Sequence, residues 1–169
     1  MMKHSIQEQL ILHEGISLLP YKCIAGKWTI GVGRNLEDNG LYEFEKKRLL
    51  GTYELTRQEV IDILQVRYIT LEEALYMLDN DIRVIKAELE NNYRWFNLLD
   101  DVRQKVIIDM RFNLGSAGFA GFKNMIREIE NMNYCKASEE MKNSKWYSQV
   151  KTRADRLVKM MATGQDYEL

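Results

Sequence analysis

The sequence predicts a mainly helical α+β fold, in which a small N-terminal lobe with a short antiparallel sheet is joined by a long helix to an all-helical C-terminal lobe. Three observations lead to this fold class: a glycine-punctuated, β-favouring segment at residues 18–34, one apolar stripe over roughly twenty residues of a later segment, and amphipathic helical patterns in the rest of the chain. At 169 residues, 46% of them apolar, the chain is long enough to bury a core as a single domain over residues 1–169. We expect an N-terminal lobe at about 15–70, a linking helix at about 71–91 and a C-terminal lobe at about 92–169, with the first helix packed on the C-terminal lobe.

The N-terminal elements follow from a change of periodicity at Gly15. Apolar residues recur at helical spacing over residues 4–14, so a first helix is expected to end near this glycine. From Leu18 to Arg34, glycines break any helix and the residues between them favour strands. This segment therefore predicts a small hairpin or meander.

Residues 41–50 and 56–68 return to helical spacing, and the longest helix is expected at residues 71–91. Two helix starts carry capping boxes, in which a threonine and a glutamate three residues on bond each other's backbone N–H groups: Thr56 with Glu59, and Thr70 with Glu73. The long helix has one apolar stripe: Leu75, Leu78, Ile82, Ile85 and Leu89. This helix is the natural link between two lobes.

Beyond residue 100 the chain is expected to be helical with one interruption. A helical face over residues 102–113 is followed by Gly115 to Gly121, whose glycines predict a turn rather than a helix. Three further amphipathic helices are expected at residues 121–132, 135–149 and 152–163, the last of them stopped by Gly164.

Charge and composition exclude several functional classes. The net charge of −1 and the pI of about 6.2 provide no cationic field, so no nucleic-acid partner is expected. No stretch approaches the ~18 apolar residues of a spanning helix, and the N-terminus lacks the apolar core of a signal peptide. We therefore expect no membrane insertion and a cytoplasmic location in the cell that makes the protein. The two cysteines have no metal-ligand spacing and no cofactor motif is present, so we expect neither a metal nor a cofactor. The protein is also expected to be a monomer.

One run of residues carries a chemical signal: Glu14-Gly15, then Cys23 nine positions after the glutamate, then Thr29 fifteen positions after it, continuing as Thr-Ile-Gly-Val-Gly. Taken singly, they are typical of a surface carboxylate, a small buried thiol and a strand hydroxyl. Taken together, they can place an acid and a water-handling group across one cleft, which glycoside hydrolysis requires. The unusual feature is Cys23, because this chemistry ordinarily uses a second carboxylate.

These residues, in this order, resemble the phage-type lysozymes of glycoside hydrolase family 24, which carry Glu-Gly, then Asp or Cys, then Thr at the same offsets. Further landmarks of that family match along the second half of the chain: Val102-Arg103, Asn113-Leu114-Gly115, Gly121-Phe122, Lys145-Trp146-Tyr147 and Arg153-Ala154. The resemblance covers nearly the whole chain and implies a lysozyme-like domain. It implies hydrolysis of the β-1,4 bond between N-acetylmuramic acid and N-acetylglucosamine in bacterial peptidoglycan. The setting it implies is a phage or prophage endolysin, which stays in the host cytoplasm until it is released to the cell wall during host-cell lysis.

The resemblance also assigns roles residue by residue. Glu14 matches the general acid, Cys23 the group that assists attack from the opposite face, and Thr29 a group that holds the water. Phe112 matches a position lining the saccharide cleft, and Arg153 matches an arginine expected near the acid. For Cys23 three roles stay open: a thiolate nucleophile, a thiolate that activates water, and a neutral thiol that only shapes the site. We favour a thiolate that stabilises the reaction or deprotonates water.

The chain departs from the family pattern at supporting positions. Arg34 replaces a histidine, and we predict that it pairs with Asp81, where the family has a His–Asp pair. The effect is expected to be structural, and modest if the pair is exposed. Met125 and Glu140 replace polar positions that touch substrate.

Two other functions remain open from the residues alone. A lytic transglycosylase needs only one acid/base carboxylate, because the muramyl 6-hydroxyl replaces water as the attacking group. A non-catalytic peptidoglycan-binding module would keep the fold without the chemistry, although the presence of Glu14 and Thr29 argues against it.

Overall fold

The computed structural model describes all 169 residues, which form two compact units. The sheet unit comprises residues 10–82, and the helical unit comprises residues 1–9 together with residues 83–169. Helices α1 (Ile6–Glu14) and α4 (Leu71–Asn92) each begin in one unit and end in the other. The predicted α+β fold class is confirmed, because a small antiparallel sheet accompanies a mainly helical chain.

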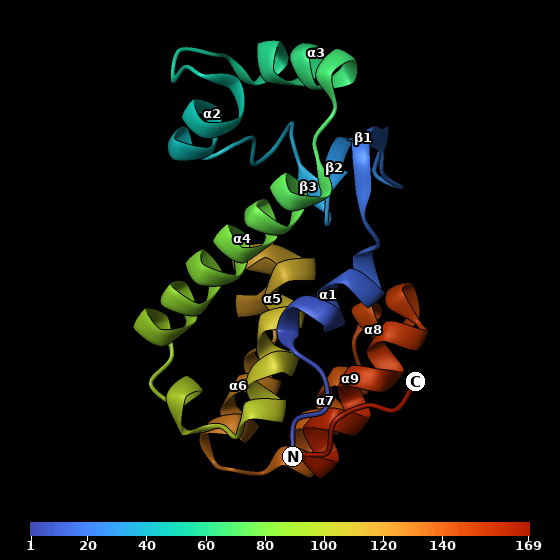
Figure 1. Cartoon of the computed structure of the whole chain (residues 1–169). Helices are drawn as coiled ribbons and strands as arrows, with labels where there is room; N and C mark the ends of the chain where they lie inside the picture. The colour runs from blue at the N-terminus through green and yellow to red at the C-terminus, as the bar shows by residue number, and fades with distance from the viewer. The chain divides into compact units, whose positions relative to one another are not determined.

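The sheet unit contains a three-stranded antiparallel sheet and two further helices. The strands are β1 (Ser17–Lys22), β2 (Trp28–Gly31) and β3 (Arg34–Asn35), and the helices are α2 (Glu43–Leu50) and α3 (Arg57–Arg67). The strands follow one another across the sheet in the order β1-β2-β3 (Figure 1). Each strand therefore pairs with its neighbour in sequence, as the predicted hairpin or meander requires.

The first hairpin fixes the register of the sheet. Tyr21 lies opposite Thr29, and Lys22 lies opposite Trp28. Because side chains alternate between faces, opposite residues share a face and successive residues do not. The ammonium group of Lys22 lies 5.0 Å from the centre of the Trp28 ring on one face, so Tyr21 and Thr29 occupy the other.

Both predicted capping boxes are confirmed. The Thr56 hydroxyl accepts a hydrogen bond from the Glu59 N–H, and the Glu59 carboxylate accepts one from the Thr56 N–H. Thr70 and Glu73 make the same reciprocal pair at the start of α4. These bonds satisfy N–H groups that the first turn of a helix leaves without backbone partners.

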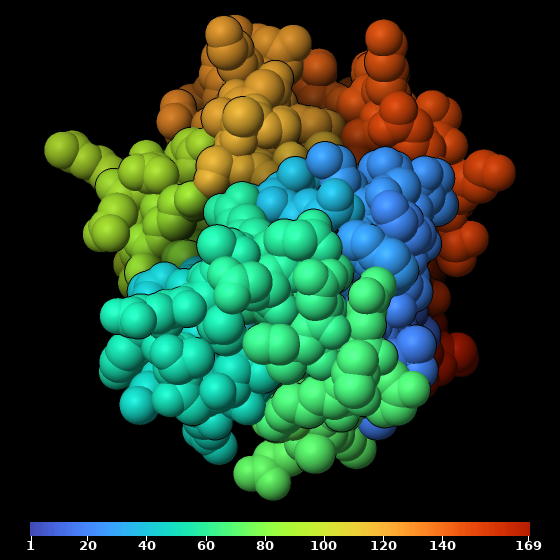
Figure 2. All heavy atoms as spheres, turned by 90° about the horizontal axis from the view of Figure 1, so that it is seen from above, coloured from blue at the N-terminus to red at the C-terminus, as the bar shows by residue number.

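The core of the sheet unit joins the sheet to α2, α3 and the first turns of α4. Its buried apolar residues are Ile30, Leu36, Leu41, Leu49, Val60, Ile61, Leu64, Ile69, Ala74 and Met77. Helices α2 and α3 lie next to each other on the face seen in Figure 2, in cyan to green. The predicted α4 stripe is buried from Leu78 onward, whereas Leu75 is 36% exposed and lies outside it.

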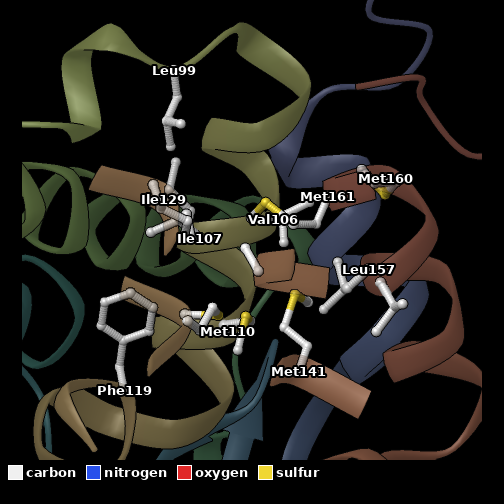
Figure 3. Packing of buried hydrophobic residues seen from close by; sticks show 14 of the residues in the cluster. Leu99, Val106, Ile107, Met110, Phe119, Ile129, Met141, Leu157, Met160 and Met161 are labelled. Carbon is white, nitrogen blue, oxygen red and sulfur yellow. The ribbon is translucent and has the colours of Figure 1, made fainter. Parts of the chain in front are cut away.

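The helical unit packs its helices around a second apolar core. Its elements beyond α1 and α4 are the short 3-10 helix η1 (Phe96–Leu98), α5 (Asp101–Ala120), α6 (Lys123–Glu130), α7 (Tyr134–Lys142), α8 (Lys145–Val150) and α9 (Thr152–Thr163). Figure 3 shows part of this core, where α5 and the C-terminal helices contribute the side chains Val106, Ile107, Met110, Met141, Leu157, Met160 and Met161. No helix of the chain combines the length and the apolar character needed to cross a membrane.

Two expectations for the helical unit were wrong. The segment from Gly115 to Gly121 is largely helical, because only Gly115 leaves the helical region (φ 75°) and α5 resumes after this kink. The single helix expected at 135–149 is two helices, since Ser144 caps α8 by accepting a hydrogen bond from the Tyr147 N–H. Helix α9 does end before Gly164, as predicted, and this glycine takes a left-handed conformation (φ 67°).

Tyr68 ends α3 in a backbone conformation that favours glycine, with φ 63° and ψ −175°. Such strain costs roughly 1–3 kcal/mol in a residue with a side chain, whereas glycine ordinarily costs about 0.5–1 kcal/mol relative to alanine through chain entropy. We therefore expect Tyr68→Gly to be about 1 kcal/mol more stable than Tyr68→Ala, measured by urea unfolding. Both variants lose the ring, so the comparison isolates the backbone. An alanine variant of equal or greater stability would show that Tyr68 carries no strain.

Candidate active site

Glu14 is the last residue of α1, and the backbone turns sharply after it. Gly15 adopts a left-handed conformation (φ 73°), and its N–H donates a 2.8 Å hydrogen bond to the Ile11 carbonyl. This ending is typical of helices closed by glycine. The half-buried Glu14 carboxyl is thereby held at the entrance to the sheet, just before β1.

Cys23 lies where β1 turns into the loop toward β2. Its carbonyl accepts a 2.8 Å hydrogen bond from the Gly26 N–H, and its own N–H donates a 3.0 Å bond to the Lys27 carbonyl. Gly26 has a positive φ of 75°, as a three-residue hairpin loop requires of its last residue. The loop therefore holds Cys23 opposite Lys27, on the face that carries Tyr21 and Thr29.

The loop also makes the Cys23 thiol more acidic. The backbone N–H of Lys27 is the main group that lowers the pKa of the thiol, and the Thr29 hydroxyl and the Ala25 N–H add to this effect against a smaller opposing effect of burial. Donors directed at sulfur stabilise the thiolate over the thiol. The pKa of Cys23 thus lies below that of an ordinary cysteine.

Thr29 lies in the middle of the hairpin, and only 4% of its surface is exposed. Its hydroxyl donates a 3.0 Å hydrogen bond to the Lys27 carbonyl and is also close enough to bond the Cys23 sulfur. A hydroxyl has one hydrogen, so it can serve the carbonyl or the sulfur in turn. The thiol and the hydroxyl predicted from the sequence are therefore neighbours.

Tyr21 belongs to the same group, although it was not predicted from the sequence. Burial raises the pKa of its phenol, and the negative charges of Glu14 and Cys23 raise it further. The phenol is therefore within electrostatic range of both groups. The available signal was the spacing of two residues between Tyr21 and Cys23 in a segment predicted to be extended, which places the two side chains on one face.

The predicted pair of Arg34 and Asp81 is confirmed, with the Arg34 Nε donating to Asp81 Oδ2 at 3.0 Å. The pair is not an exposed one, because only 3% of the Arg34 surface is exposed. A second carboxylate, that of the fully buried Glu45, also pairs with Arg34: the Arg34 Nη1 donates to Glu45 Oε1 at 2.7 Å. The guanidinium also donates to two backbone carbonyls, those of Gly40 and Met77. All three side chains thus join β3 to α2 and α4.

Two further groups complete this network. The Asn80 amide donates to Glu45 Oε2 at 2.9 Å, and the Tyr42 hydroxyl donates to Asp81 Oδ1 at 3.1 Å. Burial raises the pKa of Asp81 despite the opposing charge of Arg34. The modest effect expected for an exposed pair therefore does not apply to Arg34.

The other predicted site residues belong to the helical unit. Phe112 is partly buried against the core of that unit. The Arg153 Nε donates to Asp109 Oδ1 at 2.8 Å, and the Gln9 amide donates to the other oxygen of the same carboxylate. Asp109 thereby links α5 to α9 and to α1, a connection that had no signal in the sequence.

A surface pocket of about 320 Å³ in the helical unit includes Met125 and Glu140, the two positions that depart from the family pattern. Its other lining residues are Gly118, Gly121, Phe122, Lys123, Asn124 and Ser144. Nowhere in the chain do three or more His, Cys, Asp or Glu side chains gather in a way that could hold a metal ion.

The chain is similar to several known proteins over most of its length. The sequence pattern of the family described as phage lysozyme matches residues 12–161. The chain is 30% identical to probable T4-type lysozyme 1 of Dictyostelium discoideum over 171 residues and 26% identical to probable T4-type lysozyme 2 over 168 residues, with 96% of each chain covered in both cases. It is 25% identical over 164 residues to the pre-baseplate central spike protein Gp5 of Enterobacteria phage T4, covering 95% of this chain and 28% of the spike protein.

Proposed function

Since the chain belongs to the phage lysozyme family and is a hydrolase of peptidoglycan, we propose that it cleaves the β-1,4 bond between N-acetylmuramic acid and N-acetylglucosamine. The observation that carries this proposal is the proximity of Cys23 and Thr29 on one face of a hairpin. The negative charges of Cys23 and Glu14 both act on the phenol of Tyr21, so all of these groups lie in one region. A carboxyl, a thiol and a hydroxyl in one small region provide the acid and the water-handling groups of a glycosidase.

Glu14 supplies the proton. A glycosidic oxygen is a poor leaving group, so the carboxyl donates its hydrogen to that oxygen as the bond to the anomeric carbon breaks. The anomeric carbon then carries positive charge, and Glu14 is left as a carboxylate. A water molecule held by the Thr29 hydroxyl adds to this carbon and forms the new reducing end.

Cys23 acts as a thiolate in the second half of the reaction. Its negative charge stabilises the positive sugar, and its sulfur accepts a proton from the attacking water. The resulting thiol and the Glu14 carboxylate regain their starting states by passing that proton through solvent. The lowered pKa of Cys23 supports this role, because an ordinary thiol with a pKa of ~8.5 is only a few per cent ionised at pH 7.

The Cys23 role predicts a large effect of removing the thiolate. Cys23→Ser is expected to lower the rate of peptidoglycan cleavage about 100-fold, because a serine hydroxyl is not ionised at neutral pH. Iodoacetamide should have the same effect on the Cys135→Ser protein, in which Cys23 is the remaining cysteine. Cys23→Asp should keep substantial activity. The rate is measured as release of reducing groups from purified peptidoglycan.

Cys135→Ser serves as the matched control, since Cys135 is exposed in the helical unit and should be dispensable. Full activity in the alkylated protein or in Cys23→Ser would remove Cys23 from the reaction and leave Glu14 and Thr29 as the working groups.

We further assign the enzyme to host-cell lysis by a phage or prophage. The support is its membership of the phage lysozyme family. Expression in a Gram-negative bacterium should leave the culture intact until a pore-forming holin or chloroform opens the inner membrane, after which the culture should clear within minutes. Clearing without membrane opening would contradict this setting, and Glu14→Gln provides the inactive control.

A further inference from the structure

A fourth side chain lies among the three groups of the candidate site. Tyr21 is directly opposite Thr29 across the hairpin, so the two side chains are neighbours on one face. Cys23 follows two residues after Tyr21 and lies opposite Lys27, which places it on the same face. The opposite face carries Lys22 and Trp28 instead. The phenol, the thiol and the threonine hydroxyl therefore share one surface.

Charge connects Tyr21 to the acid as well. The negative charges of Glu14 and Cys23 both act on the phenol, and together with burial they raise its pKa. A tyrosine with an ordinary pKa of ~10 already keeps its hydrogen at neutral pH, and the raised pKa extends that range, so the phenol is a hydrogen-bond donor. It is only partly buried, so a ligand can reach it.

We propose that Tyr21 is a substrate-positioning residue, whose hydroxyl donates a hydrogen bond to the saccharide at the bond on which Glu14 and Cys23 act. This proposal rests on the proposed function. The acid and the thiolate act on opposite sides of one anomeric carbon, so a donor that is near both lies beside that carbon. A tyrosine also has few rotatable bonds, and its ring offers a flat surface to a sugar while its hydroxyl binds an oxygen.

The test compares Tyr21→Phe with the wild type on soluble glycan strands that carry stem peptides. Phenylalanine removes only the hydroxyl, so we expect kcat to fall about fivefold to tenfold, the loss of one hydrogen bond that strengthens in the transition state. KM should change less than twofold, and the melting temperature should stay within a degree of the wild type. Tyr53→Phe is the matched control, because Tyr53 is exposed in the same unit and should keep the wild-type kcat.

A Tyr21→Phe protein with the wild-type kcat would overturn the proposal, and so would a loss of kcat that is accompanied by an equal loss in Tyr53→Phe. In either case cleavage by the wild type leaves the proposed function intact. Absence of cleavage by the wild type would overturn the proposed function and the role of Tyr21 together.

Discussion

Glu14→Gln is expected to lower the rate of peptidoglycan cleavage by about 10²–10⁴-fold, because the amide has no acidic proton to give to the leaving oxygen. The change keeps the size and most of the polarity of the side chain. The thermal unfolding midpoint should therefore stay close to that of the wild type. The rate is followed as loss of turbidity of a wall suspension and, in parallel, as release of reducing groups.

Glu54→Gln is the matched control, since Glu54 is exposed in the same unit and should retain the wild-type rate. If Glu14→Gln cleaved peptidoglycan as fast as Glu54→Gln, Glu14 would not be the acid. If neither protein nor the wild type cleaved but all bound cell walls, the chain would be a wall-binding module.

Arg34→Met is expected to destabilise the protein by about 3–5 kcal/mol, the usual consequence of removing one partner from a buried ion pair. Methionine leaves Glu45 as an uncompensated charge with no exposed surface, and it also leaves Asp81 without its cation. The free energy of unfolding is measured in urea at pH 7. Arg67→Met tests an exposed ion pair with Glu73 in the same unit and should cost no more than about 1 kcal/mol.

The free energy of unfolding that Arg34→Met loses relative to the wild type should become smaller as the pH falls. Burial already raises the pKa of Asp81 in the folded protein, and removing the Arg34 charge raises it further. The folded state then binds a proton that the unfolded state releases, so stability decreases as the pH rises through this range. The destabilisation should accordingly be smaller at pH 5 than at pH 7. If Arg34→Met destabilised the protein by less than about 1 kcal/mol at pH 7, the buried ion pairs of Arg34 would be relaxed or hydrated in solution.

The parts of the fold that were predicted correctly depend on neighbours in sequence. The hairpin follows from its glycines and β-favouring residues, and both helix starts follow from threonine and glutamate three residues apart. The errors at Gly115 and Ser144 also arise from judging a residue by its neighbours in sequence alone. One glycine can kink a helix without ending it, and one serine can begin a new helix inside an uninterrupted apolar pattern.

Glu14, Cys23 and Thr29 were chosen from the sequence, whereas Tyr21 and the interactions around the thiol were not. The acidity of Cys23 depends on how the loop directs the Lys27 N–H, which requires the folded backbone. Glu45 and Asn80 are 35 residues apart in the chain, and no spacing rule connects them to Arg34. Asp109 is likewise joined to Gln9 across 100 residues. Such contacts depend on tertiary packing and have no local pattern.

The identity of the new sugar end tests the assignment of this enzyme most directly. Purified peptidoglycan is digested, the products are reduced with borohydride, and the ends are determined by mass spectrometry. A muramidase that uses Glu14, Cys23 and water leaves reduced N-acetylmuramic acid at every new end. Ends in 1,6-anhydro-N-acetylmuramic acid would contradict hydrolysis and show a lytic transglycosylase, and ends in reduced N-acetylglucosamine would contradict the proposed bond.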